Sequence, residues 1–439
     1  MTHVPSGPEI YGWAKDLFPI CRSLTGNGVR ETLTYIGNLL PGLERFEVPT
    51  GTQAFDWTVP NEWNIRDAWI ENEAGYRIVD FANSNLHVVG YSQPIDRWMS
   101  LEELDTHLHS TPELPDAIPY VTSYYAQRWG FCLPHRQREQ LKPGRYRAVI
   151  DATHAPGHMS CAELVLPGRE DREILLSTYV CHPSMANNEV SGPVVTTALA
   201  QWLMSLSDRR YTYRIFFGPE TLGAIWYLSQ NLNHLKAHVD AGFVVTNVGD
   251  ERNYSLLSSR HGETLADRAA QIALRDHAPS HDVLSYVMRA SDERQYCAPG
   301  IDLPVVSMMR SRHGDFPEYH TSLDDLSAIS PRGLEDSFTA LRTTIELLEE
   351  NAKYENQTLC EPMLSRHGLY RSLGTKQADE SARNLLNFLS YADGQNDLID
   401  ICAITGMSVA DAIEAKQALS GVGLIQQNSG HQTKLRTVA

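Results

Sequence analysis

The sequence predicts an α/β fold in which a mostly parallel sheet is sandwiched by helices, with an inserted β-rich domain and a C-terminal winged helix. From Glu173 onward, short apolar runs alternate with amphipathic stretches, which indicates strands covered by helices on both faces. Residues 48–150 instead hold short alternating apolar runs rich in aromatics and prolines, typical of a small β-rich domain. From Asp379 the pattern is helix, helix, turn, helix and wing, which is the winged-helix order.

The elements follow from the apolar patterns in chain order. Residues 8–40 predict helices with a break at residues 24–28, and we assign them to the same layer as the later helices. The expected strands are 174–180, 213–217, 242–248 and 303–308, and the expected helices are 191–206, 222–235, 262–275 and 334–352. The predicted domains are therefore a discontinuous α/β domain (1–47 and 151–355), the insertion (48–150) and the winged helix (379–439).

The predicted winged helix has clear local signals. A turn is expected at Ala392-Asp393-Gly394, and Ser408 is a good N-cap for a helix that Gly421 ends. From Asp379 to the end of the chain the charge is −3, and the expected recognition helix carries only Lys416 as a cation. Because DNA binding needs a basic face, we expect this domain to serve protein contacts, including a homo-oligomer.

The composition excludes several classes of protein. The 439 residues include 37 basic and 54 acidic residues, a net charge of −17, which argues against nucleic acid as the main partner. We find no apolar run near the ~18 residues that span a membrane and no signal peptide, so a cytoplasmic location is expected. The seven cysteines include no CxxC pair, so any metal would have to use histidine and carboxylate ligands.

Polar side chains follow three of the predicted strands. His182 and Pro183 come after the first strand, ahead of the helix start Ala186–Gly192. Glu220 lies at the next junction of strand and helix, and Asn247 and Asp250 follow the third strand. Open α/β sheets bind ligands at the carboxyl ends of their strands. Taken singly, His182 is more often a structural histidine, and Glu220 suits a helix start equally well.

Two loops add further candidates. Asp292, Glu293, Arg294 and Tyr296 form a dense cluster that is either a binding loop or a solvated one. His320 is followed by Asp324 and Asp325, which suit a metal ligand with its supporting carboxylate or, alternatively, a helix cap near Asp324. Together the histidines and carboxylates make the ligand set that zinc takes without thiolates, and an unbound carboxylate there would be a general base.

The order of these motifs resembles a known family. His182, the helix start at 186–192, Glu220 and the run Tyr319–Asp325 are similar to the zinc aminopeptidase fold that bacterial leucyl aminopeptidases share with glutaminyl cyclases. The whole chain resembles a bacterial family of aminopeptidase-like proteins, often placed near polysaccharide or natural-product biosynthesis genes, with an inserted β-rich domain of unknown function and a winged helix. The matching strings of that family are Phe55–Pro60, Glu62–Asp67, Trp129–Cys132 and Ser291–Cys297.

The resemblance implies a role for each matching position. His182 and His320 match metal-binding histidines, and Glu220 matches a carboxylate pair that here reads Glu220-Thr221 or Pro219-Glu220. Asn188 falls where the aminopeptidases carry a metal-bridging aspartate, with Glu189 beside it, and Asn247 falls where they carry another aspartate ligand. We therefore expect at most one tightly bound zinc ion.

The implied function is a metal-dependent hydrolase that acts on an amide bond in a small peptide-like or amino-acid-derived substrate. Glu220 would be the base, the cluster Asp292–Tyr296 would hold the substrate, and Asp324 and Asp250 would support the ligands. The inserted domain, with aromatic residues such as Trp57, Trp63 and Tyr124, is expected to overhang the site. The alternative is a repurposed, non-catalytic scaffold that binds a ligand or partner, because two expected ligand positions are altered.

Overall fold

The computed structural model describes residues 4–369 and 376–428 and divides the chain into two compact units. The larger unit contains the chain up to Asp267 together with His281–Thr339. The C-terminal unit contains Arg268–Ser280 together with the chain from Ala340. Each unit is described by itself below.

The larger unit is built on a sheet of eight strands in the order β1-β10-β12-β11-β13-β16-β14-β15. The central strands β12, β11, β13 and β16 are parallel, whereas β1, β10 and β14 pair in antiparallel fashion with a neighbour. Their bounds are β1 Glu44–Pro49, β10 His158–Leu166, β11 Glu173–Tyr179, β12 Thr212–Gly218, β13 Val239–Val244, β14 Ser255–Leu257, β15 Asp282–Leu284 and β16 Val305–Met309. The predicted α/β class with a mainly parallel centre is confirmed.

One predicted strand was misplaced. The apolar run 242–248 predicted a strand, but β13 is Val239–Val244, and the chain has left the sheet by Asn247, which has a φ of +52°. A run of apolar residues marks burial rather than backbone pairing, and this run stays buried beyond the end of the strand.

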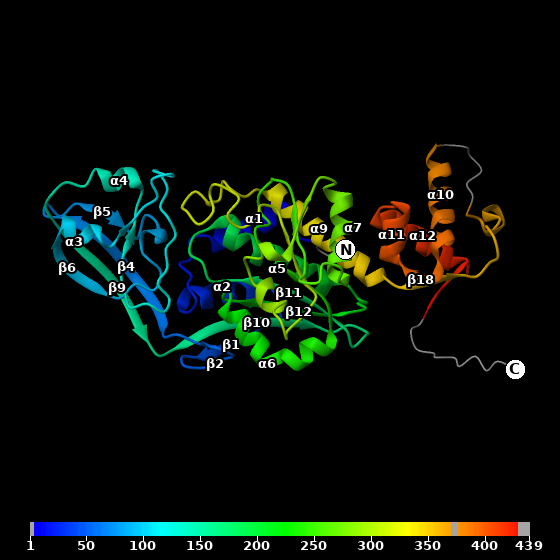
Figure 1. Cartoon of the computed structure of the whole chain (residues 1–439), viewed down its shortest axis with the longest axis horizontal. Coiled ribbons are helices and arrows are strands. Elements are labelled where there is room, and N and C mark those ends of the chain that lie inside the picture. The colour runs from blue at the N-terminus through cyan, green and yellow to red at the C-terminus, as the bar shows by residue number, and fades with distance from the viewer. Residues whose placement is uncertain (1–3, 370–375, 429–439) are drawn as a thin grey trace. The chain divides into compact units, whose positions relative to one another are not determined.

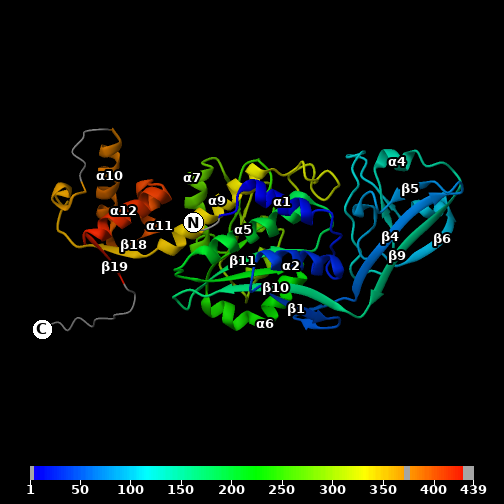
Figure 2. The same ribbon diagram turned by 180° about the vertical axis from the view of Figure 1, so that it is seen from behind.

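Helices cover both faces of this sheet (Figures 1 and 2). On one face α5 packs against β11, α1 and α2, while on the other α6 buries Leu222, Tyr227 and Leu228 against strand residues such as Leu175 and Phe216. The helices of this unit begin and end as follows: α1 Gly7–Leu17, α2 Asn27–Leu39, α5 Ser191–Ser205, α6 Leu222–His238 and α8 Glu293–Tyr296. Two more, α7 Leu265–His277 and α9 Pro331–Glu350, have residues in both units.

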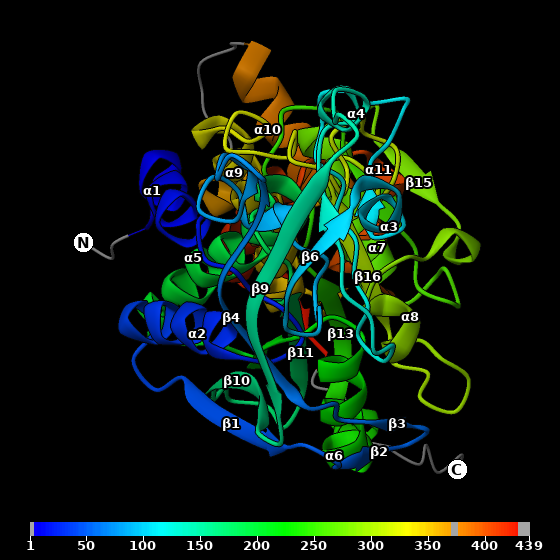
Figure 3. The same ribbon diagram turned by 90° about the vertical axis from the view of Figure 1, so that its left-hand side faces the viewer.

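The insertion forms its own antiparallel sheet in the order β5-β4-β9-β6 (Figure 3). Its strands are β4 Glu62–Asn72, β5 Arg77–Asp80, β6 Ile95–Ser100 and β9 Arg145–Ala155. Shorter elements complete it: β2 Gln53–Ala54, β3 Trp57–Thr58, β7 Leu108–His109, β8 Phe131–Cys132, α3 Leu101–Asp105, α4 His135–Glu139 and the 3₁₀ turn Asn85–His87. Trp63, Ile70 and Phe131 are among its buried residues. The last strand of this sheet, β9, runs to Ala155, five residues beyond the predicted end of the insertion at residue 150.

The C-terminal unit has the predicted winged-helix composition. Its elements are α10 Lys376–Tyr391, α11 Leu398–Thr405, α12 Val409–Gly421, β17 Lys353–Asn356, β18 Asp393–Asp397 and β19 Ile425–Gln427. As predicted, Ser408 caps α12 by accepting a hydrogen bond from the Asp411 amide, and the helix ends at Gly421. At the predicted turn Gly394 has a φ of +79°, and Asp393 accepts hydrogen bonds from the amides of Gln395 and Asn396. The sequence analysis did not predict that residues 393–397 also pair with β17, because that strand lies before α10 in the sequence and leaves no local signal.

No helix among the described residues is both long enough and apolar enough to cross a membrane. Two further 3₁₀ turns, Tyr286–Met288 and Leu364–His367, lie in connecting segments.

We expect the protein not to bind duplex DNA. Lys416 is the sole Lys or Arg of α12, and its ammonium already forms an ion pair with Glu350, while Asp411 and Glu414 beside it are acidic. Fluorescence anisotropy with labelled duplexes at low salt should show no saturable binding. Tight binding that weakens steeply with added salt would contradict this expectation.

Candidate functional site

Parallel strands bring the predicted residues to one edge of the sheet. His182 follows β11 and Glu220 follows β12, and their side chains approach with Nε2 of His182 3.7 Å from Oε2 of Glu220. His320 comes from the distant loop after β16, and its ring centroid lies 5.6 Å from that of His182. The structure therefore gathers these three side chains at one place. Their roles at that place stay a prediction.

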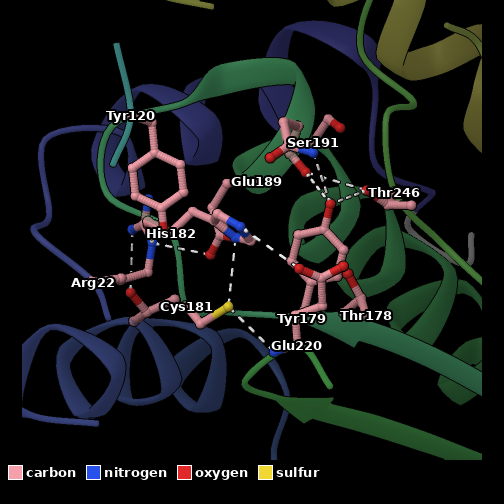
Figure 4. A network of polar contacts seen from close by, with 12 residues as sticks. Arg22, Tyr120, Thr178, Tyr179, Cys181, His182, Glu189, Ser191, Glu220 and Thr246 are labelled. Carbon is pink, nitrogen blue, oxygen red and sulfur yellow. Dashed lines mark hydrogen bonds and ion pairs between the residues drawn. The ribbon is translucent and has the colours of Figure 1, made fainter. Parts of the chain in front are cut away.

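The other side of the His182 ring faces a buried ion pair (Figure 4). Nδ1 lies 2.9 Å from Oε2 of Glu189, a residue of the π-helical turn Ala186–Val190. Nε of Arg22 donates to the carbonyl oxygen of His182 at 2.9 Å and lies 3.2 Å from Oε1 of Glu189. Glu189 and Arg22 each have only 1% of their side chain exposed.

This contact fixes the protonation of the imidazole. Burial lowers the pKa of His182, but the hydrogen bond and charge of Glu189 outweigh it, so the pKa is raised above its usual value. Because the carboxylate accepts a hydrogen bond from Nδ1–H, the ring in its neutral form carries its lone pair on Nε2, toward Glu220. A carboxylate on the far nitrogen is the usual support of a metal-binding histidine. Glu189, predicted as a ligand, lies in this supporting position.

Cys181 offers a second place for a cation. Among the described residues, Cys181, His182 and Glu189 form a group of three potential ligands whose atoms lie within 4.8 Å of one another. Burial raises the pKa of the Cys181 thiol well above its usual value, and its sulfur accepts a hydrogen bond from the Glu220 amide. The guanidinium of Arg22 beside Glu189 also opposes a cation here. The Nε2 side, with a second imidazole and Glu220, suits a metal better.

His320 is held as a neutral imidazole. Its ring stacks on Tyr319, with centroids 3.9 Å apart, and meets Tyr120 edge to face at 5.1 Å. Burial, together with the charges of His182 and His313, lowers its pKa to about 3. A neutral imidazole is the form that binds zinc.

His313 is a candidate that the sequence analysis missed. Its Nε2 is buried without a hydrogen-bond partner, and the charges of Glu293, Glu220 and His182 act on it. Burial lowers its pKa. The only signal in the sequence was a further histidine in the same loop as His320.

Asn188 and Asn247 form a pair of neutral amides. Nδ2 of Asn188 donates to the Tyr179 hydroxyl at 2.9 Å and to Oδ1 of Asn247 at 3.4 Å. Oδ1 of Asn188 and Nδ2 of Asn247 are buried and have no hydrogen-bond partner. The two positions at which the resemblance implies carboxylates therefore touch each other as uncharged groups.

Of the four residues predicted to hold the substrate, two lie beside Glu220 and two bond elsewhere. Oδ1 of Asp292 accepts a hydrogen bond from the Thr221 amide at 2.7 Å, and Nη2 of Arg294 donates to the Thr221 hydroxyl at 2.6 Å, so both lie beside Glu220. Burial and the charge of Glu220 raise the pKa of Asp292 well above its usual value. Glu293 instead accepts from the amides of its own loop, and the Tyr296 hydroxyl contacts Ser177.

Asp324 and Asp250 support the segment that carries Asn188 and Glu189. The Asp324 carboxylate accepts hydrogen bonds from the amides of Asn187 and Asn188 at 2.6 and 2.9 Å, and burial raises its pKa to about 7. Asp250 accepts a hydrogen bond from the Asn187 side chain at 2.7 Å. These carboxylates therefore bond to the helix start rather than to a histidine.

The insertion reaches the site through Tyr120. Its ring centroid lies 5.3 Å from that of His182, and its hydroxyl bonds to the Tyr124 hydroxyl at 2.8 Å. Tyr124 was among the residues expected near the site, whereas Tyr120 was not singled out. Arg66 of the same domain is exposed and pairs with Asp151.

Removing the guanidinium of Arg22 should destabilise the larger unit. Arg22→Met would leave the Glu189 carboxylate buried without its cation, which costs about 3–5 kcal/mol. The free energy of unfolding in urea measures this loss, and Glu189→Gln in the Arg22→Met background should recover part of it. Arg66→Met, which breaks the exposed pair with Asp151, is the control and should change little. Equal effects of Arg22→Met and Arg66→Met would contradict this account.

The comparisons with known proteins show the family and the fold of the chain. Residues 11–351 match the family described as Domain of unknown function (DUF4910), and residues 352–427 match a winged helix-turn-helix model. A Clostridium acetobutylicum protein, named as a polysaccharide biosynthesis protein with an aminopeptidase-like domain, is 41% identical over 96% of each chain.

Solved structures match in the same way. A crystal structure of a Clostridium acetobutylicum protein, titled as a peptidase, has a TM-score of 0.90 and 40% identity over 96% of each chain. A zinc aminopeptidase from Bacillus subtilis has a TM-score of 0.55 and 11% identity, covering 78% of this chain and 95% of its own, which shows the shared fold. The chain has an aminopeptidase-like α/β fold followed by a winged helix, and it belongs to the family described as Domain of unknown function (DUF4910).

Proposed function

We propose that this protein is a metal-dependent hydrolase of the aminopeptidase type, which holds one zinc ion and cleaves an amide bond in a small peptide-like or amino-acid-derived metabolite. The observation that carries the proposal is the meeting of His182, His320 and Glu220 at one edge of the sheet, with the far nitrogen of His182 already bonded to Glu189. The proposed location is the cytoplasm.

The side chains fit one zinc ion. Imidazoles, each neutral when it binds the metal, are ligands that zinc takes in catalytic sites, where a position stays open for water or substrate and a carboxylate not bound to the metal can act as base. His182 and His320 would hold the ion, with Glu220 beside it. A second ion would need carboxylates where Asn188 and Asn247 lie, and uncharged amides bind zinc weakly and leave the repulsion between two cations unbalanced.

Bound zinc would polarise the amide carbonyl and make a nearby water more acidic. Glu220 is the proposed general base, because its carboxylate is near His182 and 21% of its side chain is exposed. It would take a proton from the attacking water and deliver it to the leaving nitrogen. Asp292 and Arg294, which both bond to Thr221, would orient the polar end of the substrate.

The alternative is a non-catalytic scaffold that binds a ligand or partner. The paired amides of Asn188 and Asn247 favour it, because two expected ligands have been lost while the fold remains. Turnover distinguishes the two functions. A scaffold would bind metal or ligand but would hydrolyse no substrate under any condition. In either case we propose that the winged helix serves protein contacts, including self-association.

Metal analysis tests the proposal first. Protein purified without chelators should contain about one zinc per chain, and His182→Ala with His320→Ala should abolish binding while circular dichroism stays unchanged. Glu220→Gln should keep the metal but lower the hydrolysis of a dipeptide and aminoacyl-amide panel by about 10²–10⁴-fold. Wild-type protein without affinity for zinc would overturn the proposal.

Restoring the two carboxylates tests the single-ion assignment. Asn188→Asp with Asn247→Asp places two negative charges beside the site, so zinc bound per chain in a calorimetric titration should rise from about one toward two. Asn38→Asp, the same amide-to-carboxylate change at an exposed position of α2, is the control. Two tight ions in the wild type would show that the amides do not exclude the second.

A further inference from the structure

The segment Ile118–Ser123 of the insertion is bonded on both sides. Toward the site, the Tyr120 amide donates to the His320 carbonyl at 2.8 Å, and the Ser322 amide donates to the Ile118 carbonyl at 2.9 Å. Toward the insertion, the amides of Gly90 and Ser123 complete a second set of backbone bonds. Backbone hydrogen bonds to the His320 loop and to the rest of the insertion therefore fix the position of Tyr120.

His320 depends on this segment for its conformation. Its φ is +55°, in the left-handed region, which costs a non-glycine residue roughly 1–2 kcal/mol. The bond from the Tyr120 amide and the antiparallel bridge between Pro119 and Thr321 hold the backbone on either side of it. A residue in such a conformation persists only where its surroundings over-determine it.

The Tyr120 ring contacts both histidines at once. Its centroid is 5.3 Å from His182 and 5.1 Å from His320, and its hydroxyl is directed to the Tyr124 hydroxyl. The phenol group therefore presents its ring, not its polar atom, to the two imidazoles. Figure 4 shows this ring standing beside His182.

A cavity lies next to the same ring. It has a volume of about 10 Å³, room for about one water molecule, and Tyr120 lines it together with Arg22, Trp63, Asn85 and Gly90. Tyr120 is thus shared between this cavity and the two histidines. Shortening the side chain would add the volume of its ring to the space beside the imidazoles.

We propose that Tyr120 is a specificity-determining residue, which limits the substrate to one with a small side chain next to the cleaved amide bond. This inference rests on the proposed function. It makes the inserted domain part of the site, because the Tyr120 ring contacts both histidine rings.

Amino-acid hydroxamates, which chelate zinc through their two oxygens, are probes that need no turnover. Calorimetry with glycine hydroxamate and phenylalanine hydroxamate should show that the zinc-loaded wild type prefers the glycine compound. Tyr120→Ala should shift the ratio of the two dissociation constants about ten-fold or more toward the phenylalanine compound. Tyr120→Phe should keep the wild-type ratio because the ring remains. Tyr125→Ala, at a residue 57% exposed and two positions beyond the segment, is the control.

The outcomes are distinguishable. Wild-type protein that binds neither zinc nor hydroxamate would overturn the proposed function and this inference together. Zinc binding with an unchanged ratio in Tyr120→Ala would overturn the inference alone, as would a changed ratio in Tyr120→Phe. If Tyr120→Ala cannot hold zinc, Tyr120→Leu, which keeps an apolar contact, takes its place in the comparison. If neither Tyr120→Ala nor Tyr120→Leu binds zinc, that result contradicts the proposal that Tyr120 only limits the size of the substrate side chain.

Discussion

The buried contact among His182, Glu189 and Arg22 is the interaction on which the site depends. Glu189 bonds to Nδ1 of His182, and Arg22 lies against both the carboxylate of Glu189 and the carbonyl of His182. A carboxylate this deeply buried is tolerable only with a cation beside it. Arg22 comes from the segment between α1 and α2, so the first helical layer is tied directly to the carboxyl end of β11. The contact orients one imidazole and leaves Nε2 for chemistry.

Backbone strain gathers around the same place. Thr221, Asn247 and His320 each have a positive φ, at 65°, 52° and 55°, and each follows a strand or lies in the loop that returns to the sheet edge. Asparagine and histidine enter this region more readily than other non-glycine residues, but a β-branched threonine rarely does. Hydrogen bonds from Thr221 to Asp292 and from Tyr120 to His320 hold two of them. Residues in strained backbone conformations cluster at functional sites, where the position of a side chain matters more than local stability.

The sequence predicted the layers and the gathering of His182, Glu220 and His320, because strand ends follow from apolar patterns that can be read locally. It placed Glu189 near the metal, but could not show that its carboxylate turns to Nδ1, since the π-helical turn at 186–190 changes the direction of the side chain. Arg22 and Tyr120 escaped notice for a different reason. Their partners lie far away in the sequence, and one arginine or tyrosine among many carries no pattern. The strand β18 was missed likewise, because it pairs with a strand before α10.

The central claim is that the metal lies on the Nε2 side of His182 and not in the group formed by Cys181, His182 and Glu189. X-ray absorption spectroscopy of zinc-loaded protein tests it most directly, with Cys181→Ser protein as the control. We predict nitrogen and oxygen neighbours only, at about 2.0–2.2 Å, with imidazole scattering and identical spectra for the control. A sulfur neighbour at about 2.3 Å that disappears in Cys181→Ser would contradict the account.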